Sequence, residues 1–162
     1  MLPVQEDKMI GEIDRKALYT IGHSNHAIEA FVGLLKAHEI KTVADVRSWP
    51  ASRRLPHFNR APLQQSLTVA GIRYLWFGKE LGGKGDGDTS RPGFQSRIRE
   101  LAELAGGGRT TIMCAEEDPM RCHRKHLLGA PLTAEGVEIL HIRGDGSVFE
   151  DEAAQLSLFA DA

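Results

Sequence analysis

Cysteine is scarce in this sequence, and it has neither a long apolar run nor a strong net charge. Two cysteines in 162 residues are too few for a disulfide framework. The first residues carry charges where a secretory signal needs an apolar segment, so we expect reduced thiols and a cytoplasmic location. No apolar run reaches about 18 residues, which excludes a transmembrane helix. A net charge of -2 excludes an overall basic field, so any surface that binds phosphate must be a local patch.

Short apolar runs alternate with helical patterns along the chain, which predicts an α/β fold. Strands are expected over 17–22, 42–47, 72–77, 110–114 and 138–143, and the last of the intervening helices over about 121–128. We expect three layers: a mainly parallel, Rossmann-like sheet of five or slightly more strands, with helices on both faces. The predicted organisation is a flexible arm (1–16), a single α/β domain (17–145) and an acidic tail (146–162).

Three of the expected strands run directly into polar clusters. GHSN follows the first strand, DVR closes the second, and CAEE follows the fourth. Because the carboxyl ends of parallel strands share one edge of a sheet, these clusters are expected to meet in one crevice. The candidate catalytic residues are His23, Ser24, Asp45, Cys114, Glu116, Cys122 and His123.

The segment CAEEDPMRCHR contains both cysteines and leaves three interpretations open. A thiol nucleophile is favoured by the expected position of Cys122 in the first turn of a helix, where the helix amino end and Arg124 would stabilise a thiolate. Zinc or iron would require His23 or Glu116 to complete the ligand shell, and the spacing lacks the tight pairs of structural zinc sites. Alternatively, Cys114 is a small buried hydrophobe. Glu116 is also a candidate general base. No metal ligand is assigned and no cofactor is identified.

Arginines interleaved with aromatic residues form the one basic cluster, in the segment DVRSWPASRRLPHFNR. Guanidinium groups and aromatic faces suit phosphate binding and base stacking, whereas the alternative is a solvated loop paired with acidic residues. The candidate substrate-binding residues are Arg47, Arg53, Arg54 and Arg124. Chemistry on a base inside a duplex would require flipping it out, with Trp49 or Phe58 as the substitute stacking partner.

The ordered set IGHSN, DVRSWPASRR, FGKELGG, RPGF and CAEEDPMRCHR resembles the DUF 488 family of proteins of unknown function, over roughly residues 17–143. The family's hallmark positions fall on Gly22, His23, Ser24, Asp45, Arg47, Pro50, Ser52, Arg53, Leu81, Gly82, Gly83, Cys114, Glu116, Pro119, Cys122, His123 and Arg124. The resemblance implies a single α/β domain with a polar site and suggests an enzyme, but it supplies no reaction.

The last residues carry a separate motif. QLSLF resembles the peptide with which bacterial DNA polymerases and repair proteins bind the sliding clamp. Leu156, Leu158 and Phe159 would enter an apolar pocket, while the Gln155 amide bonds at its rim. The alternative is an amphipathic turn that packs back on the domain.

Two functional hypotheses follow from these motifs. The first is a cytosolic bacterial enzyme that acts on nucleic acid or a nucleotide through the Cys/His/Glu/Arg crevice and is recruited to DNA by its tail. If it is an enzyme, a hydrolase or transferase on a phosphate-bearing or nucleobase substrate is expected. The second is a non-catalytic adaptor that senses metal or redox state through Cys114 and Cys122. No membrane partner is expected.

Overall fold

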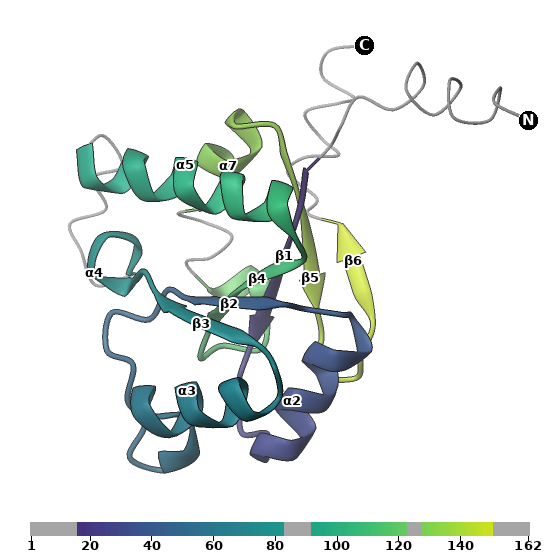
Figure 1. Ribbon diagram of the computed structural model, residues 1–162. Helices are drawn as coiled ribbons and strands as arrows, with labels where there is room; N and C mark the ends of the chain where they lie inside the picture. Colours follow the sequence, from purple (N-terminus) through teal and green to yellow (C-terminus); the bar gives the residue numbers. More distant parts are fainter. Residues whose placement is uncertain (1–15, 83–91, 123–127, 151–162) are drawn as a thin grey trace, which may run out of the picture.

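A six-stranded sheet forms the centre of the structure, a computed structural model that describes residues 16–82, 92–122 and 128–150 (Figure 1). The strands are β1 (Lys16–Gly22), β2 (Thr42–Asp45), β3 (Arg73–Trp76), β4 (Thr110–Cys114), β5 (Val137–Ile142) and β6 (Val148–Glu150). Their order is β3-β2-β4-β1-β5-β6. The first five strands are parallel, and β6 is antiparallel to β5.

Helices cover both faces of the sheet, as Figure 1 shows. The helices are α2 (Ile28–Ala37), α3 (Arg60–Val69), α4 (Gly78–Leu81), α5 (Pro92–Gly107) and α7 (Gly129–Ala134), with 3-10 turns η1 (Pro56–Phe58) and η2 (Pro119–Arg121). One apolar cluster joins α4, α5 and α7 to the sheet, and a second joins α2 and α3 to its other face. The strands β1 to β5 supply both clusters, because successive side chains point to opposite faces.

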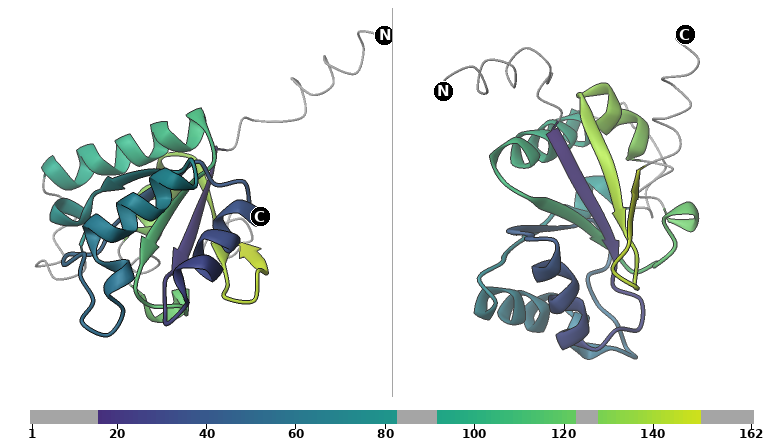
Figure 2. Two further views of the ribbon diagram at one scale, coloured as in Figure 1. Left: turned by 60° about the horizontal axis from the view of Figure 1, so that its bottom comes forward. Right: turned by 90° about the vertical axis from the view of Figure 1, so that its right-hand side faces the viewer.

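The expected α/β class and the mainly parallel sheet are confirmed, but a Rossmann-like arrangement is not. The doubly wound dinucleotide-binding order is 3-2-1-4-5-6, whereas here β4 lies between β2 and β1. The sheet is also mixed, because the edge strand β6 is antiparallel to β5. The sequence analysis did not predict this strand. Figure 2 shows how strongly the sheet twists between its two helical layers. Within the described residues, no helix is both long and apolar enough to cross a membrane.

The polar residues after β1 do not cap the next helix. The N-cap of α2 is Ala27, and the Ser24 backbone N–H bonds the Ala115 carbonyl oxygen, in a turn where Ser24 has a positive φ. One expectation about a helix needs correction. Cys122 does not lie in the first turn of a helix: it follows η2 with extended backbone angles. Most of the helix expected over 121–128 falls on residues 123–127, outside the described part of the chain.

The neighbouring strands β1 and β4 are followed by connections that diverge. After β1 the chain passes through α2 on one face of the sheet and continues to β2. After β4 it leads to α7 on the other face and continues to β5 on the opposite side of β1. In open parallel sheets, ligands bind beyond the strand ends at such a point of divergence. The carboxyl ends of β1 and β4 are therefore the first place to look for a site.

Candidate functional site

A pocket of about 430 Å³ lies at the carboxyl ends of β1, β2 and β4. Its volume is within the range of pockets that hold small ligands. His23 lines it after β1, and the segment after β2 contributes Arg47, Ser48, Trp49, Ala51 and Ser52. The remaining lining comes from the loop after β4, from Cys114 to Glu116 and from Arg121 to Cys122. The polar clusters that end three strands thus meet at one rim, as the sequence predicted.

A buried ion pair supports this pocket from the β2 side. Arg47 Nε and Nη2 donate to the Asp45 carboxylate at 2.9 and 2.8 Å, and the Arg47 backbone N–H donates to it as well. Tyr74 from the neighbouring strand β3 donates its hydroxyl to Asp45 Oδ2 at 2.6 Å. Burial, followed by the Asp45 charge, raises the pKa of Tyr74, so the phenol keeps its proton. Asp45 is completely buried and its acceptor capacity is used inside the protein.

The Arg47 guanidinium group has one nitrogen that is not used by the hydrogen bonds described above. Its side chain is 6% exposed, and Nη1 is a buried nitrogen without a hydrogen-bond partner in the described part of the chain. The Arg47 carbonyl oxygen is fixed by the Trp76 indole N–H at 2.9 Å, so the residue is held at both its backbone and its side chain. Buried donors are nearly always paired in native proteins, and leaving one unpaired costs about 1–3 kcal/mol. This nitrogen is therefore the donor in this region whose partner the described residues do not supply.

His23 is a neutral imidazole at the same rim. Its ring stacks on Phe58 with centroids 4.3 Å apart, and Nδ1 lies 2.8 Å from the Ser24 carbonyl oxygen. Because a carbonyl can only accept, Nδ1 carries the proton and Nε2 keeps its lone pair. Burial lowers the pKa of His23 to about 4, the Ser24 hydrogen bond opposes that shift, and the Arg47 charge adds to it. The residue is consequently an acceptor at neutral pH rather than a cation.

The loop after β4 extends the strand pairing before it turns. The backbone N–H groups of His23 and Ser24 bond the carbonyls of Cys114 and Ala115 at 2.8 and 2.9 Å. Glu116 then accepts the Asp118 backbone N–H. The Glu117 carboxylate forms an ion pair at 2.8 Å with Arg143, which follows β5. Glu117 therefore has a structural role in this loop.

Glycines let the segments around the pocket approach closely. A Cβ atom on Gly22 would overlap the Glu116 carbonyl, and one on Gly78 would overlap the Arg47 carbonyl. A Cβ on Gly82 would meet the Ser48 hydroxyl. Only glycine allows such backbone contacts. Gly22, Gly78 and Gly82 are therefore needed to bring the segments around the pocket together.

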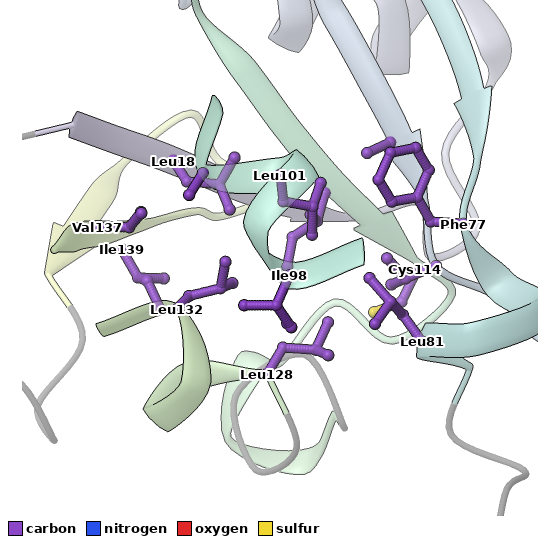
Figure 3. Packing of buried hydrophobic residues seen from close by; sticks show 14 of the residues in the cluster. Leu18, Phe77, Leu81, Ile98, Leu101, Cys114, Leu128, Leu132, Val137 and Ile139 are labelled. Carbon is purple, nitrogen blue, oxygen red and sulfur yellow. The ribbon is translucent and has the colours of Figure 1, made fainter. Parts of the chain in front are cut away.

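Both cysteines are buried and neither forms a disulfide. Cys114 and Cys122 belong to the apolar cluster beneath α5, and Figure 3 shows Cys114 beside Leu81 at the end of that cluster. The Cys114 thiol also lies 3.5 Å from the Glu116 carbonyl oxygen. Cys114 is thus a packed residue that also lines the pocket. Within residues 16–82, 92–122 and 128–150, no group of three or more metal-binding side chains occurs.

The structure brings together some predicted site residues and separates others. His23, Arg47, Cys114, Glu116 and Cys122 line the pocket, with Asp45 bonded to Arg47. Ser24 does not line it, and Arg53 and Arg54 are exposed beside it. His123, Arg124 and the peptide residues Gln155, Leu156, Leu158 and Phe159 lie outside the described residues.

Three features of the aromatic and basic segment were not foreseen. Phe58 is completely buried beneath His23, so it cannot serve as a stacking partner for a base. Arg60 packs over the Trp76 ring at 4.9 Å. The contribution of Tyr74 was missed because its contact with Asp45 depends on the pairing of β2 with β3, for which the local pattern contains no signal.

Fold and site together define an α/β protein with a polar pocket at the carboxyl ends of parallel strands. The chain belongs to the family described as domain of unknown function DUF488, whose model matches residues 27–90 and 87–130. No curated protein and no solved structure shows significant similarity to it.

Proposed function

We propose that this protein is an enzyme that acts on nucleic acid or a nucleotide bound in the pocket at the ends of β1, β2 and β4. The observation that carries the proposal is the buried Arg47 Nη1, which has no partner in the described part of the chain. Its location where the connections of β1 and β4 diverge supports a ligand-binding role. The exposed Trp49 on the pocket wall adds an aromatic surface suited to a base.

The other lining residues can supply the chemistry of a hydrolase or transferase. His23 presents an unprotonated Nε2 and is the proton acceptor in this proposal. Cys114 is the candidate nucleophile, and Glu116 offers a second carboxylate base at the mouth. Arg47 positions the substrate.

Binding of a fluorescent single-stranded oligonucleotide and of nucleoside monophosphates tests this proposal. The variant Asp45→Asn/Arg47→Met removes the donor without leaving a buried charge, so folding should be retained. One hydrogen bond from a charged donor corresponds to at least ~10-fold in affinity. The matched control Arg73→Gln removes an exposed arginine at the start of β3, at the opposite edge of the sheet, and should bind as the unmodified protein does. Unchanged affinity in the double variant would reject Arg47 as the binding group.

Recruitment to DNA is the second part of the proposal. Residues 155–159, outside the described residues, resemble a sliding-clamp-binding peptide. Immobilised clamp should retain the full chain and lose a chain truncated before Gln155, while Asp161→Asn outside the peptide serves as the control. Equal recovery of the full and truncated chains would reject recruitment through this peptide.

A redox-sensing adaptor is the alternative, because Cys114 and Cys122 line the same pocket and share one apolar cluster. Mild peroxide should then join the two thiols, with loss of two hydrogens in the intact mass and a reversal by reductant. Oxidation of single thiols alone, without a disulfide, would reject this alternative.

A further inference from the structure

The charge of Arg47 is already balanced inside the protein. Two of its three guanidinium nitrogens donate to Asp45, and Asp45 accepts a further hydrogen bond from the Tyr74 hydroxyl. Among the described residues, the other charged side chains on the pocket wall are Glu116 and Arg121, which have opposite signs. A phosphate monoester carries nearly two negative charges near neutral pH, and these wall residues together leave no net positive charge to balance them. The deep part of the pocket is therefore suited to a polar but uncharged group.

A donor and an acceptor remain at this depth. Arg47 Nη1 supplies N–H groups, and His23 supplies the lone pair of Nε2. Both residues line the same pocket, and the Arg47 charge contributes to the lowered pKa of His23. An uncharged heterocycle with adjacent acceptor and donor atoms on its edge matches this pair, whereas phosphate oxygens offer acceptors alone.

The mouth of the pocket has the complementary features of a surface for a nucleic acid strand. Four large apolar side chains are exposed in the described part of the chain, and Trp49, 69% exposed, lines this pocket. Met120, another of the four, precedes the lining residue Arg121. Arg53 and Arg54 are exposed next to the lining residue Ser52. An aromatic face with arginines around it is the arrangement that binds single strands by stacking and by phosphate contacts.

We propose that the pocket takes the base of an unpaired nucleotide, which stacks on Trp49 and bonds Arg47 and His23 with its edge, while the strand's phosphates remain outside on Arg53, Arg54 and Arg121. This inference rests on the proposed function and names the part of the substrate that enters the site. It predicts that binding depends on the base and on its being unpaired.

Fluorescence anisotropy with the full chain tests the inference. The probes are a labelled single-stranded DNA, the same strand with all internal bases replaced by abasic residues, and the matching duplex. Equal length and charge make phosphate contacts equivalent in the two single strands. Loss of stacking should weaken binding of the abasic strand at least ~5-fold, and the duplex should also bind more weakly than the single strand.

Variants assign the effect to the pocket. Trp49→Ala should markedly reduce the difference between the two single strands, since only the edge contacts with Arg47 and His23 remain, and Trp49→Phe should retain most of it. Val69→Ala, an exposed apolar side chain on α3 that does not line this pocket, should leave the difference unchanged. Both Trp49 variants are expected to fold, because the indole is mostly exposed.

The outcomes separate this inference from the proposed function. Equal affinities for the normal and abasic strands, or a base dependence that is undiminished in Trp49→Ala, would overturn base recognition in this pocket but leave nucleic acid binding intact. Equal affinity for the duplex would overturn the requirement for an unpaired nucleotide. No binding of any nucleic acid or nucleotide would overturn the proposed function itself.

Discussion

Asp45→Asn is the perturbation that tests most directly how the pocket is held. The carboxylate accepts hydrogen bonds from the Arg47 backbone and side chain and from the Tyr74 hydroxyl, all in a completely buried position. An asparagine has the same shape, but its NH₂ group would face these donors, and the Arg47 charge would lose its counter-ion. Breaking one side of a buried ion pair lowers the free energy of unfolding by about 3–5 kcal/mol.

Urea unfolding followed by tryptophan fluorescence measures this change, since Trp76 bonds the Arg47 carbonyl oxygen beside the pair. The double variant Asp45→Asn/Arg47→Met should regain most of the lost free energy, because no buried charge remains. Glu39→Gln is the control: its partner Arg109 lies 3.8 Å away and Glu39 is 72% exposed, so the change should be below ~1 kcal/mol. A loss in Asp45→Asn no larger than in this control would refute the buried pair and with it the argument about Arg47.

Three further predictions follow from the same geometry. The pKa of His23 is lowered to about 4 in the folded chain and is ~6.5 in the unfolded chain. As the pH falls from 6.5 toward 4, the unfolded chain binds a proton that the folded chain does not, so up to ~3 kcal/mol of the free energy of unfolding is lost. In His23→Gln, the free energy of unfolding in urea should therefore depend less on pH over this range. Gly22→Ala should lower the free energy of unfolding by ~2–4 kcal/mol, whereas Gly33→Ala on the open side of α2 should raise it by ~0.5–1 kcal/mol, which thermal unfolding compares directly. Cys114 and Cys122 are buried, so a neutral alkylating reagent should label them at least ~10-fold more slowly in native protein than in urea, and equal rates would contradict this packing.

Local sequence patterns predicted the elements well where apolar side chains were periodic. The strand expected over 110–114 occurs as β4, and the other four strands begin and end within two residues of their expected limits. Gly71 ends α3 with a positive φ, as expected of a glycine that follows a helix. β6 was missed because three residues at the sheet edge contain too little apolar pattern to distinguish them from a loop.

The sequence predicted which residues belong to the candidate site better than it predicted the contacts among them. His23, Arg47 and Cys114 were recognised because each follows or ends a strand, and parallel strands share an edge. The stacking of Phe58 under His23 was not recognisable, since it joins two loops that are far apart in the chain. The residue type alone does not show whether a particular phenylalanine is buried or exposed.

The sequence alone determined the alternation of strands and helices, the polar clusters at the strand ends and the family, because these depend on periodicity and on residue type. The tertiary structure decided the rest. Hydrogen bonding between distant strands inserts β4 between β2 and β1, which places Cys114 beside Gly22, and it pairs β2 with β3, which brings Tyr74 onto Asp45. The course of the chain at the end of β2 turns the Arg47 side chain back onto Asp45 and leaves Nη1 without a partner among the described residues.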